Sequence, residues 1–164
     1  MKIEPVVDGK FNDLLALNNA SLPHVNLIDL ADMQYFYDCA EIFNQVRTDQ
    51  GMLAGFVIAM TTGRSYESIN YQWFVDKFES FLYIDRIIVN SPFRRDGVAQ
   101  ALYQGLIGHA KSTGIPMLTC EVNRSPPNPA SLALHEKLGF RVVGSQFTEE
   151  GKKEVLLMVL DLHA

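Results

Sequence analysis

Residues 87–102 read Ile-Ile-Val-Asn-Ser-Pro-Phe-Arg-Arg-Asp-Gly-Val-Ala-Gln-Ala-Leu, and this stretch decides the fold. It opens with β-branched residues that predict the end of a buried strand. Pro92 stops that strand, because proline cannot donate to a β-ladder. Beyond the turn the apolar spacing becomes helical, with Val98, Leu102 and Leu106 on one stripe. The stretch therefore predicts a strand, a short polar turn and a helix.

A turn that opens a helix is a potential anion site. The N–H groups of the first helical turn have no acceptor inside the helix, and the helix dipole adds positive potential there. Gly97 and Ala99 are small, so a bulky anion can approach the backbone closely. Many such units carry a glycine for packing alone, so the turn by itself is a weak indication of function.

The sequence on both sides extends this unit. Residues 81–89 predict a strand, 97–112 a helix and 115–122 a second strand, which implies a parallel pair with a right-handed crossover. The other predicted elements are a strand at 2–7, helices at 11–17, after Asp29 and at 130–138, and hairpins of 41–47 with 52–60 and of 140–147 with 153–162. We expect one domain over residues 1–164, of the α/β (α+β) class, with a mixed, mostly antiparallel sheet and about four helices.

The segment 61–80 is the least regular part of the chain and is rich in aromatic residues. They are Tyr66, Tyr71, Trp73, Phe74 and Phe78. A loop of this length inside a compact domain is often functional, and it then predicts a binding surface. A surface helix over 69–78 that packs its rings on the core is an equally good interpretation.

The composition excludes some classes of function. Fourteen Lys and Arg against nineteen Asp and Glu give a net charge of −5, which argues against a nucleic-acid surface. No apolar run approaches the roughly 20 residues that a membrane helix needs, and no signal peptide is evident. Cys39 and Cys120 lie far apart and predict buried free thiols. We expect a soluble, cytoplasmic protein with no metal cluster.

Two motifs together carry a family resemblance. Arg94, Gly97 and Ala99 match the pattern Arg/Gln-x-x-Gly-x-Gly/Ala, and the turn fits neither the nicotinamide fingerprint nor a Walker loop. A second block matches Asn-x-x-(small)-x-x-Leu-Tyr-Glu-Lys-x-Gly-Phe at Asn128, Ser131, Leu134, Glu136, Lys137, Gly139 and Phe140. With the order of strands and helices, these motifs resemble the GCN5-related N-acetyltransferase family over roughly residues 81–140.

The resemblance implies that acetyl-CoA binds where two parallel strands splay apart, near Val89 and Val122. Backbone N–H groups of Arg95 to Ala99 would hold the pyrophosphate, and the backbone of Ile87 and Val89 would line the pantetheine arm. Asn128 would hydrogen-bond the cofactor. The full set of cofactor-binding residues implied is Ile87, Ile88, Val89, Arg94, Arg95, Asp96, Gly97, Val98, Ala99, Asn128 and Ser131.

Direct transfer to an amine needs a base, because an amine is mostly protonated at neutral pH. Asp85 is the favoured base, because it lies four residues before Val89 and so on the same side of the strand. The competing interpretation is that Asp85 forms an ion pair with Arg86. Glu121 is the alternative base. The resemblance makes the N–H of Val89 the oxyanion donor.

His135 stands where the family usually has a tyrosine as the proton donor. A histidine donates near neutral pH more readily than a tyrosine, so His135 is the predicted acid, although it can also serve only as a core or cofactor contact. Tyr83, Tyr103 and Tyr71 are possible substitutes.

We therefore predict an N-acetyltransferase that uses acetyl-CoA and acts on a primary amine of a small molecule or peptide. The predicted acceptor site contains Tyr71, Trp73, Phe74 and Tyr83. The resemblance also implies a possible homodimer. The alternatives are a non-catalytic acyl-CoA-binding module, which the missing tyrosine favours, and an acyltransferase for another acyl group.

Overall fold

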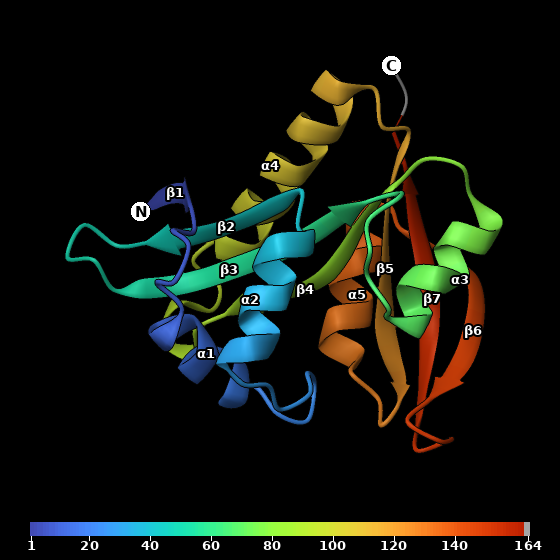
Figure 1. The fold of residues 1–164 in the computed structure, drawn as a ribbon, viewed down its shortest axis with the longest axis horizontal. Coiled ribbons are helices and arrows are strands. Elements are labelled where there is room, and N and C mark those ends of the chain that lie inside the picture. Colours follow the sequence, from blue (N-terminus) through green and yellow to red (C-terminus); the bar gives the residue numbers. More distant parts are fainter. Residues whose placement is uncertain (163–164) are drawn as a thin grey trace. The chain divides into compact units, whose positions relative to one another are not determined.

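The strands and helices follow one another along the chain as Figure 1 shows, in a computed structural model that describes residues 1–162. The elements are β1 Lys2–Pro5, α1 Asn12–Asn19, α2 Leu30–Cys39, β2 Ile42–Arg47, β3 Leu53–Thr61, α3 Ile69–Lys77, β4 Leu82–Val89, α4 Val98–Thr113, β5 Met117–Ser125, α5 Pro129–Leu138, β6 Arg141–Thr148 and β7 Lys153–Asp161. A short 3-10 turn, Ser91–Phe93, lies between β4 and α4.

The sheet is mixed. Its strand order is β1-β2-β3-β4-β5-β7-β6. The pair β4–β5 is parallel, with Leu82 opposite Leu118 and Tyr83 opposite Thr119. The pairs β1–β2, β2–β3, β5–β7 and β6–β7 are antiparallel. The predicted fold class is confirmed, although the described residues form five α-helices rather than about four, because α3 is an additional one.

Local signals in the sequence fix several helix ends. Asp29 caps α2 in a reciprocal box with Asp32, because each side chain accepts from the other residue's backbone N–H. Asn128 caps α5 by accepting from the N–H of Ser131. Gly139 ends α5 with φ of 102°, a left-handed conformation that glycine adopts without a steric penalty.

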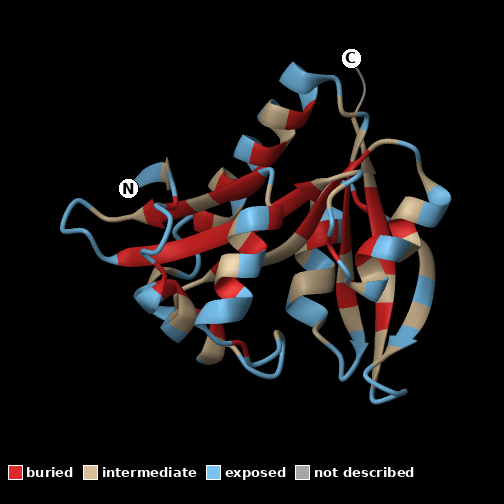
Figure 2. Ribbon diagram, in the orientation of Figure 1, coloured by how far each residue is buried: buried red, intermediate tan, exposed pale blue. Residues whose placement is uncertain are grey.

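The chain divides into two units, which are described separately. The first comprises Met1–Met60 and Ile84–Gly108. Its strand β3 is buried along almost its entire length, as Figure 2 shows. Rings from the start of α1 and from the strands lie in its core, with Phe43 between Phe11 and Phe56 at centroid distances of 6.1 and 6.2 Å. Gly55 allows close approach of β4, since a Cβ there would lie 2.7 Å from the carbonyl oxygen of Ile88.

The second unit comprises Thr61–Tyr83 and His109–Ala164, of which residues up to 162 are described. Within the aromatic segment 61–80, residues Ile69–Lys77 form the helix α3. The interpretation as a packed helix is therefore correct for these residues. Tyr71 packs edge-to-face on Phe81 and Tyr83. α3 lies beside β6, where the side chain of Gln146 bonds to Asn70 at 2.7 Å. That one domain spans 1–164 stays a prediction.

None of the helices among residues 1–162 is long and apolar enough to cross a membrane.

Candidate active site

The turn between β4 and α4 has an unusual backbone. Arg95 and Gly97 both have positive φ, at 69° and 80°. Ala101 makes the first helical bond, from its N–H to the carbonyl of Gly97 at 3.0 Å, so the N–H groups of residues 97–100 have no acceptor inside the helix. A Cβ added at Gly97 would meet nothing within 4 Å, so the space above this backbone is open. The turn can therefore accept an anion.

Not every predicted amide of the turn is available. The N–H of Asp96 donates to the carbonyl of Phe93 at 3.2 Å, so it stabilises the turn itself. The side chains of Arg94 and Arg95 are exposed. Val98 is buried, and its side chain packs toward Gly55. The backbone amides that precede the first helical bond are thus the better candidates for binding an anion. The buried side chain of Val98 holds this part of the backbone to the core.

Asn90, which was not among the predicted site residues, fixes the start of the turn. Its N–H donates to the carbonyl of Ala54 at 2.8 Å and its side-chain amide to the carbonyl of Leu53 at 2.9 Å. These bonds hold the end of β4 to the start of β3. An asparagine directly before Ser-Pro was the available signal, because asparagine commonly satisfies backbone groups where a strand gives way to a turn.

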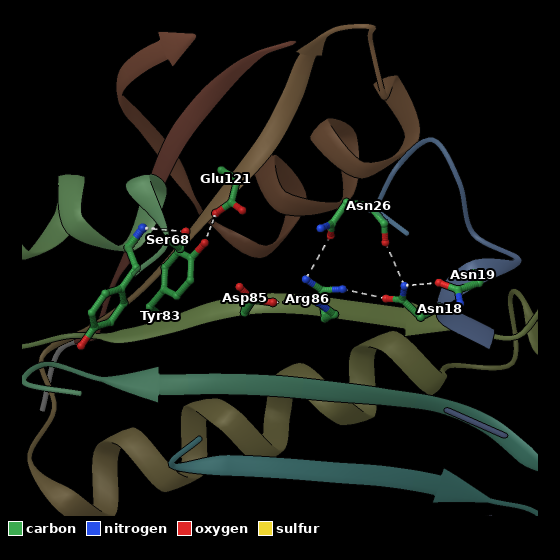
Figure 3. Close-up of polar contacts among 9 residues, drawn as sticks. Asn18, Asn19, Asn26, Ser68, Tyr83, Asp85, Arg86 and Glu121 are labelled. Carbon is green, nitrogen blue, oxygen red and sulfur yellow. Dashed lines mark hydrogen bonds and ion pairs between the residues drawn. The ribbon is translucent and has the colours of Figure 1, made fainter. Parts of the chain in front are cut away.

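In the second unit, Tyr83 and Glu121 form a pair, shown in Figure 3. The hydroxyl of Tyr83 donates to Oε2 of Glu121 at 2.7 Å. Tyr83 is fully buried on β4 and Glu121 is half-buried on β5. Strand register produces this contact, since Tyr83 lies opposite Thr119 and the side chain two residues later in β5 points to the same face. A carboxylate beside a phenol is suited to taking and passing a proton.

Asp85 is engaged elsewhere. Its Oδ2 accepts from Nε of Arg86 at 2.7 Å, and the two side chains are only 5% and 8% exposed. Asp85 is therefore the counter-charge of a buried guanidinium. The structure thus contains the ion pair between Asp85 and Arg86 that was the competing interpretation. This pairing does not favour Asp85 as the base.

His135 lies inside the second unit, and its side chain is 4% exposed. Its Nδ1 is 2.7 Å from the carbonyl oxygen of Ser131, and a carbonyl can only accept, so Nδ1 carries the hydrogen. Burial lowers the pKa of His135, while the bond to Ser131 opposes that effect. The neutral imidazole therefore has a lone pair on Nε2 rather than a proton to give. The structure does not favour His135 as the acid.

This burial predicts a pH dependence of stability. The folded pKa of His135 lies below its unfolded value of about 6.5, so the unfolded chain binds the proton first as the pH falls. We expect His135 to contribute a loss of stability below about pH 6.5.

Urea unfolding at pH 7.5 and 5.5 tests this expectation. Between these two pH values, His135→Asn should lose less unfolding free energy than the wild type. His24→Asn, at an exposed histidine, is the control and should behave as the wild type. Equal losses in all three proteins would contradict the prediction.

The four predicted acceptor residues differ in how far they are buried. Tyr71, Phe74 and Tyr83 are all 0% exposed, so the three rings are core residues and none of them lines an open acceptor surface. Tyr83 differs from the other two because its hydroxyl bonds to the half-buried carboxylate of Glu121. The hydroxyl of Tyr71 donates to the carbonyl of Thr61 at 2.6 Å. Trp73 is half-buried against Gly144, where a Cβ would lie 2.5 Å from its ring. The aromatic segment therefore builds the core of the second unit.

Among residues 1–162, no group of three or more His, Cys, Asp or Glu side chains is placed to hold a metal ion.

Comparison with known proteins identifies a family. Residues 11–140 match the Acetyltransferase (GNAT) family. The chain belongs to this family. One curated relative is the [Ribosomal protein bS18]-alanine N-acetyltransferase from Escherichia coli K12. It is 31% identical to this chain over 80 residues, which are 46% of this chain and 53% of the relative. The chain thus spans about half the length of this curated relative.

Solved structures share the GNAT fold. Ard1 from Thermoplasma volcanium superposes with a TM-score of 0.79 and 15% identity, over 99% of this chain and 98% of Ard1. A NatC complex bound to Gag peptide and CoA gives a TM-score of 0.75 and 17% identity, over 99% of this chain and 100% of the other. At these identities the likeness concerns the fold.

The GNAT family uses acetyl-CoA, so acetyl-CoA is the anionic ligand to compare with the open turn. The turn fits the anionic pyrophosphate of that molecule on two observations. Four backbone N–H groups, at residues 97–100, precede the first helical bond, and a Cβ on Gly97 would meet no heavy atom within 4 Å.

Proposed function

We propose that the chain transfers an acetyl group from acetyl-CoA to the N-terminal amine of a polypeptide. The observation that carries this proposal is the open turn at Gly97 in a chain of the GNAT family. In the second unit, the Tyr83–Glu121 pair supports it separately. The curated relative acts on an alanine of a ribosomal protein, and the NatC neighbour is bound to a peptide. Both favour a peptide acceptor over a small amine.

The chemistry of the acceptor agrees with a modest base. An α-amine has a pKa of about 8, against about 10.4 for lysine, so a carboxylate reached directly or through water can take its proton. We propose Glu121 as this base and Tyr83 as the residue that orients it.

The turn would hold the donor. The N–H groups of Gly97, Val98 and Ala99 would bind the pyrophosphate, with the exposed Arg94 and Arg95 adding positive charge. The backbone of Ile87 and Val89 would line the pantetheine arm, and Ile88 would fix the strand in the core. Asn128 and Ser131, at the start of α5, remain proposed contacts. When bound, acetyl-CoA supplies the acetyl thioester.

Location and assembly are also proposals. Both cysteines, Cys39 and Cys120, are buried and free, which suits the reducing cytoplasm, and burial raises the pKa of Cys120. β6 is the last strand in the order and exposes Phe147, which favours a homodimer at this edge. The charge of −5 disfavours nucleic acid as a partner. Light scattering on the purified chain measures the assembly.

A turnover assay tests the proposal. Acetyl-CoA is mixed with short peptides that begin with Ala, Ser or Met, with the same peptides blocked at the N-terminus, and with spermidine. We expect thiol release only with the unblocked peptides, and mass spectrometry should place the acetyl group on the first residue. Release with spermidine alone would contradict a peptide acceptor.

A second candidate is an acyl-CoA-binding module without turnover. The neutral, buried His135 favours it, because the family's usual proton donor is missing at that position. It predicts that acetyl-CoA binds in a calorimeter while thiol release stays at background with every amine. Competition among acyl-CoAs in the same calorimeter separates acetyl from other acyl groups.

A further inference from the structure

Three aromatic rings from one segment surround the ring of Tyr83, the phenol that bonds to Glu121 in the second unit (Figure 3). Tyr71 lies edge-to-face on it at a centroid distance of 5.5 Å, Phe74 is tilted at 5.9 Å and Tyr66 is tilted at 6.4 Å. All four rings are buried, and none is more than 6% exposed. A side chain in a close-packed interior keeps one rotamer, because another would need a void. The three rings therefore fix where the hydroxyl of Tyr83 lies.

Tyr71 is itself held in place by two hydrogen bonds. Its hydroxyl donates to the carbonyl of Thr61 at 2.6 Å and accepts from the N–H of Arg64 at 3.0 Å. Its ring also packs edge-to-face on Tyr66 at 5.5 Å and on Phe81 at 5.8 Å. Turning this ring away would break both hydrogen bonds and leave polar groups of the interior unsatisfied, which is costly. Tyr71 is therefore a fixed wall for its neighbours.

The helix that carries two of these rings lies on the sheet face that carries Glu121. Glu121 is opposite Leu157 of β7, and Leu157 is opposite Gly144 of β6. Residues directly opposite on neighbouring strands point to the same face. A Cβ on Gly144 would lie 2.5 Å from the ring of Trp73, so α3 covers this face at β6. The helix is thus fixed against β6 while its buried rings meet Tyr83.

We propose that Tyr66, Tyr71 and Phe74, the aromatic set, position the base by fixing Tyr83, whose hydroxyl then holds the carboxylate of Glu121 in one orientation. The inference rests on the proposed function, in which Glu121 is the base. A hydrogen bond from a phenol to an ionised carboxylate is short and strong, so a fixed hydroxyl orients the carboxylate. A base must lie within hydrogen-bond reach of the proton that it takes, so losing this orientation lowers the rate of transfer. The aromatic set acts through Tyr83, and it does not need to touch the acceptor.

Carbon NMR tests the contact without turnover. In protein labelled at the tyrosine Cζ, Tyr83→Phe identifies the resonance of Tyr83, whose position reports the hydrogen bond of the phenol. In Phe74→Leu we expect this resonance to move about half of the way to its position in the urea-unfolded chain, because the cavity left by the ring lets Tyr83 turn. Phe43→Leu is the matched control. Phe43 is a buried ring of the first unit, and its replacement should leave the resonance unchanged.

Kinetics tests the role in turnover. Phe74→Leu should lower kcat for an Ala-initial peptide about tenfold while the affinity for acetyl-CoA stays within about twofold, and Phe43→Leu should leave both within about twofold. Tyr83→Phe should lower kcat at least as far as Phe74→Leu. Adding Phe74→Leu to Tyr83→Phe should lower kcat by no more than about twofold further, because the hydroxyl through which the ring acts is already absent. Losses that multiply in the double variant would overturn the proposal.

Tyr66→Leu covers a failure of Phe74→Leu to fold. Tyr66 is the most exposed member of the aromatic set, at 6%, and its loss should move the Tyr83 resonance in the same direction. An unchanged resonance in the folded ring variants overturns the inference whatever the activity, and a moved resonance with an unchanged kcat overturns the positioning role. Absence of turnover in the wild type would instead contradict the proposed function and the positioning role with it, while the resonance still decides whether the aromatic set holds the hydroxyl.

Discussion

Glu121→Gln is expected to lower kcat by about a hundredfold or more, the usual effect of removing a general base. Glutamine has the same shape and can still accept the hydrogen bond from Tyr83, which is 2.7 Å long in the wild type. It cannot take a proton from the acceptor amine. Steady-state kinetics with an Ala-initial peptide measures kcat, and calorimetry should give an unchanged affinity for acetyl-CoA.

Glu154→Gln is the matched control for this variant. Glu154 lies on β7, opposite Ser125 of β5, and forms an ion pair at 3.4 Å with Arg124, whose side chain is 60% exposed. The same chemical change there should leave kcat within about twofold, because an ion pair with an exposed partner contributes little. If Glu121→Gln also kept its kcat, Glu121 would not be the base and Asp85 would again be the candidate to test.

Gly97→Val should reduce the affinity for acetyl-CoA by at least about a hundredfold, which corresponds to about 2.8 kcal/mol. Gly97 has φ of 80°, which a β-branched residue adopts only with strain. The new side chain would meet no protein atom within 4 Å of its Cβ, so it would occupy the space that the pyrophosphate needs. Calorimetric titration with acetyl-CoA measures the loss.

Gly9→Val separates the loss of binding from backbone strain. Gly9 has the same φ of 80° and equally open surroundings, but it lies in the turn after β1. Both variants should lose similar stability in urea unfolding, and only Gly97→Val should lose affinity. Undiminished binding by Gly97→Val would show that the turn does not hold the donor.

Much of the fold follows from local sequence signals. The helix that begins after Asp29, the helix over 130–138 and the strand–turn–helix around Gly97 are all present as predicted. These features depend on residues within four positions of each other, so periodicity and capping preferences suffice to predict them. The family resemblance is confirmed for the same reason, because its motifs lie in these segments.

The roles of individual side chains were harder to predict. From the sequence, Asp85 and Glu121 were both possible bases, and the aromatic segment was either a binding loop or a packed helix. The structure pairs Asp85 with Arg86, and it pairs Glu121 with Tyr83, 38 positions away. It also buries Tyr71 and Phe74 completely. No local pattern distinguishes these outcomes.

The sequence by itself therefore determined the family, the order of the elements and the open glycine turn. Only the tertiary structure decided that Glu121 rather than Asp85 stands beside a phenol, and that Arg86 bonds to Asn18, 68 positions away. The physical reason is that helix ends and turns are set by neighbouring backbone groups. The partner of a buried polar side chain is set by strand register and by the closure of long loops.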